Sequence, residues 1–113
     1  MKGERLGAFE ELVLLAVCTL GTEAYGVTIQ EAIEAEANRR ISIGAVYAAL
    51  DRLERKGHVE SWVGGATAER GGRRKRFFKA TSGGYHALAE MRAVRERFWR
   101  TIEDLGLSGG LSS

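Results

Sequence analysis

Residues Ala8 to Leu20 constrain the fold most, because they are predicted to form a helix that is apolar on almost every side. Glu10 and Glu11 fall in its first turn, where the positive end of the helix dipole favours acidic side chains. A helix that is apolar all round must be buried on more than one face. We therefore expect this helix to lie at the centre of the fold or to be shared with a partner chain, and to end at Gly21.

Two more helices are predicted before residue 58. Residues Tyr25 to Ala37 place apolar side chains at helical spacing and predict an amphipathic helix. Its start is open, since Thr28 with Glu31 also fits a capping box and would place the first turn later. The third helix is expected to start after Ser42, a favourable N-cap residue, and to stop at Gly57. Its predicted buried stripe consists of Ile43, Val46, Leu50 and Leu53.

The other side of the third helix is small and almost uncharged in its first part. A helix that faces only water usually carries charges there, so this composition favours a surface that approaches another body closely. The residues on or near this side are Gly44, Ala45, Tyr47, Ala48, Asp51 and Arg52.

A basic β-hairpin is predicted after the third helix. Residues Val59 to Val63 and the segment from Arg74 onward have the β-branched and aromatic content of strands, and glycines at 64, 65, 71 and 72 bracket a long loop between them. Residues 70–79 hold six basic side chains and no acid, and without them the net charge of +2 becomes −4. A confined basic patch on a slightly acidic body suits a surface that binds a polyanion. The six are Arg70, Arg73, Arg74, Lys75, Arg76 and Lys79.

A last helix, capped by Thr81 or Ser82, is predicted to run to about Leu105. Its apolar side chains follow alternating steps of three and four residues, and Arg95 occupies the one position that breaks the pattern. This stripe and the surplus apolar surface of the first helix predict a homodimer, whereas packing onto its own domain is the alternative. The expected dimer residues are Leu12, Leu15, Leu88, Met91, Phe98, Ile102 and Leu105.

The residues that enzymes and metal sites need are missing from the sequence. There is no paired carboxylate in an apolar setting, no nucleophile motif and no phosphate loop, so we expect neither an enzyme nor a cofactor. Cys18 is the only cysteine and is expected to be a small buried hydrophobe, while His58 and His86 have no partner at metal-ligand spacing. The longest apolar run is too short to span a membrane, and no secretory signal is recognisable, which predicts a cytoplasmic protein.

Three helices followed by a hairpin are typical of a winged helix, in which the third helix enters the DNA major groove and the hairpin wing touches the backbone or the minor groove. The predicted fold is therefore mainly α with a small β-hairpin. It divides into a winged-helix domain over 1–81, a C-terminal dimerisation helix over 82–106 and a frayed tail over 107–113.

The segments LVLLAVCTLGTEAYGVTIQEAI (12–33), ISIGAVYAALDRLERKGHVES (41–61) and GGRRKRFFKATSGG (71–84) resemble the PadR family of bacterial transcriptional regulators. The likeness is to its short subgroup, which has a single C-terminal dimerisation helix. The family has a Tyr-Gly pair after an apolar first helix, a Gly-x-x-Tyr-Pro-x-Leu recognition helix and an Arg-Lys-Tyr-Tyr wing. Here Ala48 replaces the usual Pro, Ala45 stands where Thr is common, and Phe77 and Phe78 replace the Tyr pair. The two departures in the helix concern which bases are read and not where the helix lies, and the two Phe residues remove hydroxyls from the wing strand.

The resemblance implies a dimeric DNA-binding regulator, a repressor that binds an inverted-repeat operator and is released by a signal or ligand. The wing cations would contact phosphates or reach into the minor groove. A winged helix that only binds proteins is the main alternative, and RNA binding is a third. The expected DNA-binding residues are Tyr25, Ser42, Gly44, Ala45, Tyr47, Ala48, Arg52, Arg73, Arg74, Lys75 and Arg76.

Physical chemistry gives some of these residues distinct expected roles. Gly44, Ala45 and Ala48 would let the backbone approach base edges. Tyr47 can offer its hydroxyl to a phosphate and its ring to a thymine methyl, although packing at the rim of the core is the alternative. Ser42 with the helix N-terminus could hold a phosphate, and Arg52 fits a contact to the DNA backbone or a solvated charge.

The effector is less well defined by the sequence. Multidrug-sensing relatives bind planar compounds between the two subunits, stacked on a Trp of the last helix. Arg95 lies near that position here, with Phe98 and Trp99 about one turn later, so these three are the candidate ligand residues. Dimer packing is the preferred role for Trp99.

Overall fold

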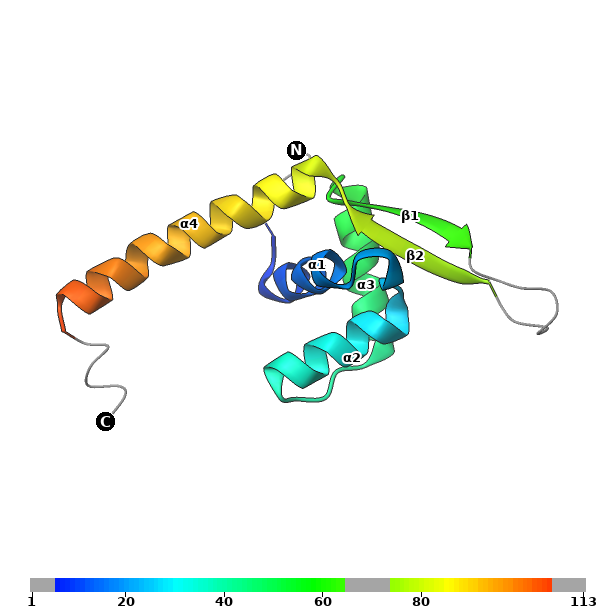
Figure 1. Cartoon of the computed structure of the whole chain (residues 1–113), viewed down its shortest axis with the longest axis horizontal. Coiled ribbons are helices and arrows are strands. Elements are labelled where there is room, and N and C mark those ends of the chain that lie inside the picture. The colour runs from blue at the N-terminus through cyan, green and yellow to red at the C-terminus, as the bar shows by residue number, and fades with distance from the viewer. Residues whose placement is uncertain (1–5, 65–73, 107–113) are drawn as a thin grey trace.

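The computed structural model describes residues 6–64 and 74–106, and Figure 1 shows their arrangement. Within these residues four α-helices, one 3₁₀ turn and a two-stranded hairpin follow one another along the chain. They are α1 (Ala8–Leu20), η1 (Gly21–Glu23), α2 (Gly26–Ala37), α3 (Ile43–Arg55), β1 (Val59–Gly64), β2 (Lys75–Ala80) and α4 (Ser82–Asp104). This order confirms the predicted winged helix followed by a C-terminal helix.

Helix α1 is the centre of the fold, as its apolar sequence predicts. It contacts α2, α3, α4 and β2. Val13, Leu14 and Val17 are buried against these elements, because they share one face of the helix. Leu12 and Leu15 point elsewhere and keep 36% and 43% of their surface exposed. The helix is therefore apolar on two sides, and the residues that the structure describes cover one of them fully and the other in part.

The hairpin is attached to the helical body along β2. Its strands pair antiparallel, with Val59 opposite Ala80 and Trp62 opposite Phe77. The backbone N–H of Phe78 donates to the carbonyl of Ala24 at 2.9 Å, so the segment before α2 pairs with the free edge of β2. Phe78 is fully buried in the core between the helices and the hairpin. The wing is thus anchored by backbone pairing and by one large side chain.

Two details differ from the sequence predictions. Helix α2 starts at Gly26 and not after Thr28, since the Thr28 hydroxyl lies inside the first turn and accepts from the backbone N–H of Tyr25 at 3.0 Å. The later start was therefore wrong. Ile43 was expected in the buried stripe of α3 but keeps 37% of its surface exposed, because it begins the helix at the edge of the packed elements. Ala49 is buried in its place, alongside Val46.

Helix α4 leaves the body after a tightly packed base. The Thr81 hydroxyl accepts from the N–H of Gly84 at 3.0 Å and donates to the Gly57 carbonyl at 2.7 Å. Gly84 is buried so closely against the His58 carbonyl that a Cβ at this position would overlap the oxygen. Beyond this base the helix passes α1, and its C-terminal part projects away from the other elements (Figure 1). The tail expected to fray, 107–113, and the wing tip, 65–73, lie outside the described residues.

Candidate nucleic-acid interface

The sequence places α3 so that its small side chains face outward. The Ser42 hydroxyl caps the helix by accepting from the Ala45 N–H at 3.0 Å. Val46, Leu50 and Leu53 are buried, which turns the opposite side of the helix to the surface. As predicted, that side is exposed and carries Gly44, Ala45, Tyr47, Ala48, Asp51 and Arg52. A Cβ at position 44 would meet no atom within 4 Å.

Tyr47 is partly exposed at the surface and partly packed at the rim of the core, the two alternatives that the sequence leaves open. It keeps 38% of its surface exposed, yet its ring packs against Gly26 at the start of α2. A Cβ at position 26 would overlap the hydroxyl oxygen and ring atoms of Tyr47. Glycine is therefore needed in the Tyr25-Gly26 pair for steric reasons, and Gly26 helps to set where Tyr47 lies on the surface. The Tyr-Gly pair is visible in the sequence, whereas this role of Gly26 depends on the packing of α3 against α2.

The turn between α2 and α3 is held by side chains of α2. Asn38 ends α2 in the left-handed conformation, with φ of 55°. The Gln30 side-chain amide donates to the Ile41 carbonyl at 3.0 Å, and the Ile41 N–H donates to the Glu34 carboxylate at 2.9 Å. These contacts fix the angle between the two helices. The sequence gives no signal for them, because polar residues on an amphipathic helix usually face solvent.

A buried carboxylate joins α1 to the end of α3. The Glu10 side chain is only 7% exposed, and its two oxygens accept from Arg52 Nε and Lys56 Nζ, each at 2.7 Å. The Gly7 N–H donates to the same carboxylate at 3.1 Å. Arg52, expected to contact the DNA backbone or solvent, therefore has a partner within the chain. Its side chain keeps 44% exposure, so contact with a phosphate stays a prediction.

The charges around Glu10 determine its protonation. Burial opposes ionisation and raises the pKa, but hydrogen bonds from Lys56, Arg52 and the Gly7 backbone, with the positive charge of Lys56, outweigh it. The pKa of Glu10 falls from 4.5 to about 2. The carboxylate is ionised at neutral pH and holds α3 against α1 through charge-assisted hydrogen bonds.

The described wing cations have different surroundings. Arg74 is exposed, and Lys75 lies over the Tyr25 ring with its Nζ 4.3 Å from the centroid. Tyr25 also packs edge-on against Phe77, which is only partly buried. Arg76 instead bonds to acidic side chains of α3. Arg70 and Arg73, the remaining cations of the predicted patch near the wing tip, lie outside the described residues.

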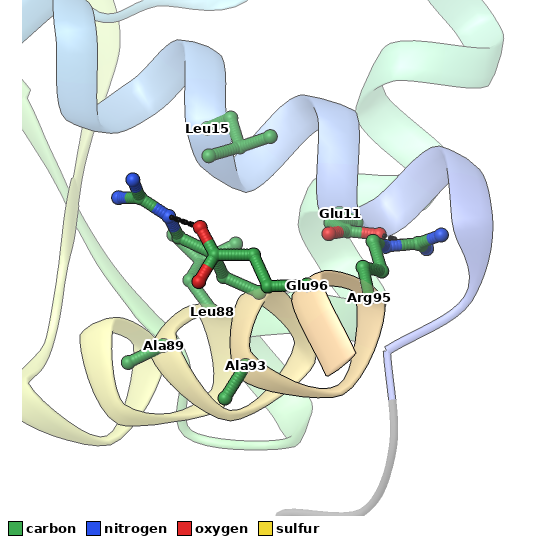
Figure 2. A pocket seen from close by; sticks show the side chains of 8 residues that line it. Glu11, Leu15, Leu88, Ala89, Ala93, Arg95 and Glu96 are labelled. Atoms are coloured by element: carbon green, nitrogen blue, oxygen red, sulfur yellow. Dashed lines mark hydrogen bonds and ion pairs between the residues drawn. The ribbon is translucent and has the colours of Figure 1, made fainter. Parts of the chain in front are cut away.

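An apolar groove runs between α1 and α4 (Figure 2). It encloses about 440 Å³, and its walls include Leu15 from α1 and Leu88 from α4. Ion pairs lie at its edges: Arg95 binds Glu11 across the two helices at 2.7 Å, and Arg92 binds Glu96 along α4 at 3.0 Å. The hydrogen bond from Arg95 to Glu11 and the carboxylate charge raise the pKa of the guanidinium. Ala89 and Ala93 complete the wall and were not singled out in the sequence.

The expected dimer residues of α4 and the three candidate ligand residues are spread along this helix. Leu88 is partly buried against the core. Met91 and Ile102 are half-buried, whereas Phe98 and Leu105 are 69% and 67% exposed. The structure does not gather the three candidate ligand residues into one cavity: Arg95 lines the α1–α4 groove, Phe98 lines a shallow hollow further along α4, and Trp99 lines neither.

In the part of the chain that the structure describes, no three His, Cys, Asp or Glu side chains lie where they could hold a metal ion. His58 is 3% exposed, with its carbonyl against Gly84 of α4. Cys18 is partly buried, which raises the pKa of its thiol. None of the helices formed by the described residues combines the length and apolarity needed to cross a lipid bilayer.

Comparison with known proteins identifies the family. The model of the transcriptional regulator PadR-like family matches residues 14–90, which is more than half of the chain. The chain belongs to the PadR-like family. Its members are transcription factors and not enzymes, which confirms that expectation for this PadR-like chain. A search of curated proteins finds no significant match.

Solved structures share the fold of this PadR-like chain. A PadR-like transcription factor from Bacteroides fragilis is 22% identical, with a TM-score of 0.70, and the match covers 86% of this chain and 88% of that one. A PadR-like regulator from Bacillus cereus is 19% identical, also with a TM-score of 0.70, over 88% and 91% of the two chains. Bacillus subtilis PadR in complex with operator DNA is 15% identical, with a TM-score of 0.64, over 75% of this chain and 47% of that one.

Proposed function

We propose that this PadR-like regulator binds duplex DNA as a homodimer, with α3 in the major groove and the wing on the phosphate backbone. The observation that carries the proposal is the outward face of α3, where Gly44, Ala45 and Ala48 leave the backbone open to close approach. The basic wing lies beside the same helix, since Arg76 of β2 bonds to Glu54 of α3. A small, uncharged helix face next to a cationic hairpin complements the groove and backbone of DNA.

The residues proposed to contact DNA are assigned by their exposure where the structure describes them, and Arg73 by its place in the basic run of the sequence. Tyr47, Gly44, Ala45 and Ala48 face a groove, while Ser42 at the helix N-terminus and Tyr25 beside the wing suit phosphates. Arg73, Arg74 and Lys75 supply the wing contacts. We assign Arg52 primarily to its ion pair with Glu10.

The regulatory part of the proposal is repression at an inverted-repeat operator, relieved by a small-molecule effector. A dimer presents its two recognition helices about one DNA turn apart, roughly 34 Å, which favours a symmetric site. Arg95, Phe98 and Trp99 remain the proposed effector residues, and a second copy would be needed to bring the last two into one cavity with the groove. Binding to chromosomal DNA would place the protein in the cytoplasm.

Replacing Arg74 and Lys75 with Ala is expected to weaken DNA binding and reduce its salt dependence. Each lost phosphate contact lowers the slope of log affinity against log salt concentration by about 0.9. The measurement is a gel shift or fluorescence titration at several salt concentrations with DNA from upstream of its own gene. Replacing Arg97 and Arg100 on α4 with Ala removes the same charge far from the wing and should leave the slope unchanged.

If the slope of log affinity against log salt concentration is unchanged in the Arg74/Lys75 variant, the proposed contact between the wing and DNA is contradicted. No binding of the wild-type chain to any duplex would favour a winged helix that binds only proteins. Competition between RNA and duplex DNA tests the remaining alternative, RNA binding.

Phe98→Glu is expected to convert a dimer into a monomer. The side chain is 69% exposed in the single chain, and a charge placed in an apolar interface would be desolvated without a partner. Sedimentation velocity at micromolar concentration measures the result, and Arg100→Glu, on the same helix but outside the apolar stripe, is the control. A wild-type chain that sediments as a monomer would rule out the proposed dimer.

A further inference from the structure

Arg76 differs from its neighbours in the wing because acidic side chains of α3 surround it. Its Nη2 donates to Glu54 Oε1 at 2.5 Å, and its Nη1 lies 3.7 Å from Asp51 Oδ1. Its Nε donates to the hydroxyl of Ser61 on β1 at 3.2 Å. All three guanidinium nitrogens therefore face partners within the chain.

The partners of Arg76 are themselves joined. The Ser61 hydroxyl donates to Glu54 Oε2 at 2.8 Å, so both Glu54 oxygens are used. The guanidinium carbon lies 5.0 Å from the centre of the Phe78 ring, which is fully buried. The cluster thus connects both strands of the hairpin to α3 directly above the side chain that anchors the wing.

Arg74 and Lys75 lack this arrangement. Neither has an acidic partner among the described residues, although Lys75 lies over the Tyr25 ring. To reach a phosphate, Arg76 would have to give up two carboxylates whose charges already offset its own, whereas its neighbours would give up none. Among the wing cations Arg74, Lys75 and Arg76, Arg76 is consequently the least available to DNA.

We propose that Arg76 is a positioning residue, which holds the wing against the recognition helix through Glu54, Asp51 and Ser61, and that it does not bind phosphate. The role rests on the proposed DNA binding, because its effect is to keep the remaining wing cations in register with α3. The planar fork of arginine is required, since it reaches three partners at once and lysine offers a single charged centre.

Glu54→Gln tests the role by the sign of its effect. The variant removes a negative charge beside the wing, so electrostatics alone would tighten binding to DNA. Loss of a positioning contact weakens it instead, by roughly two- to fivefold for a partly exposed ion pair. Glu60→Gln, which removes the same charge from the outer face of the hairpin, should leave binding unchanged or slightly tighter. Unchanged or tighter binding by Glu54→Gln would overturn the proposal.

The variant Arg76→Lys is a second, independent test of whether Arg76 positions the wing or binds a phosphate. It keeps the charge that a phosphate contact needs and loses the fork, so a positioning role predicts binding as weak as that of Arg76→Ala. In Arg76→Ala, the slope of log affinity against log salt concentration should change by less than about half of the 0.9 expected for one lost phosphate contact. The double variant Glu54→Gln/Arg76→Lys should be no weaker than the weaker single variant, because both remove one interaction. Wild-type binding by Arg76→Lys would assign Arg76 to the DNA backbone.

Amide hydrogen exchange in the DNA-free protein keeps this proposal separate from the proposed function. Exchange of the β1 and β2 amides near residues 63 and 76 should accelerate in Glu54→Gln and Arg76→Lys and not in Glu60→Gln. Equal exchange in all three variants would refute the positioning role even if the protein bound no DNA. Absence of DNA binding by the wild-type chain with accelerated exchange in the two variants would refute only the proposed function.

Discussion

Glu10→Gln is expected to lower the free energy of unfolding at neutral pH by about 2 to 3 kcal/mol. The gap between a pKa of 4.5 and one of about 2 corresponds to about 3 kcal/mol, and rehydration of the partly exposed Arg52 and Lys56 recovers some of it. Urea unfolding of the variant and of the wild-type chain at pH 7 measures the difference. Glu31→Gln, on the exposed side of α2, serves as the control and should change little.

The same pair of proteins should differ in how stability depends on pH. The folded-state pKa of Glu10 lies below the unfolded-state value, so its stabilisation is complete above about pH 5 and is lost as the pH falls toward 2. The wild-type chain should therefore approach the stability of Glu10→Gln across this range. A constant difference from pH 7 to pH 2, or none at pH 7, would contradict the ionic role of Glu10.

Gly26→Ala is expected to destabilise the fold by about 1 to 3 kcal/mol, the usual cost of forcing a methyl group into a filled space. The added Cβ overlaps the Tyr47 ring, which must rotate away from the position it holds on the outward face of α3. DNA affinity should fall as well, because the displaced ring lies on the proposed reading surface. Urea unfolding and a DNA titration of the same preparation measure both effects.

Two variants separate this steric effect from the general effect on stability of replacing a helical glycine with alanine. In a Tyr47→Ala background the obstacle is absent, so Gly26→Ala should cost little further stability. Gly44→Ala fills open space on α3 and should raise stability by up to about 1 kcal/mol, as expected for Gly replaced by Ala within a helix. It should nevertheless weaken DNA binding if the backbone approaches the bases there. Equal destabilisation by Gly26→Ala in both backgrounds would refute the steric explanation.

The helices, the hairpin and the exposed side of α3 could be predicted from the sequence because each depends on local spacing. Ile43 was wrongly predicted to be buried, because periodicity does not show where along a helix the packing against neighbouring elements ends. The start of α2 was left open because Thr28 satisfies the capping pattern in either register. Its hydroxyl bonds to the Tyr25 N–H and the Glu23 carbonyl only after the 3₁₀ turn has brought these groups together.

The roles of charged residues were harder to predict, since their partners lie far away in the chain. Glu10 looked like a residue that favours a helix N-terminus, yet it binds side chains 42 and 46 positions later. Arg76 looked like every other cation of the basic run, and only the packing of β2 beside α3 brings it to Glu54. The charge pattern therefore predicted the basic hairpin, whereas the different partners of its cations could be found only in the three-dimensional structure.

Glu10 and Glu11 are consecutive, yet one holds α3 and the other holds α4. A single turn of α1 consequently contacts both α3 and the long C-terminal helix. With 23 residues α4 is about 34 Å long, and a tilt of about 5° moves one end by about 3 Å relative to the other. In the proposed dimer this leverage would convert a small change at Glu11 or Arg95 into a different spacing of the two recognition helices. Half-site spacing could then be retuned by substitutions that never touch DNA.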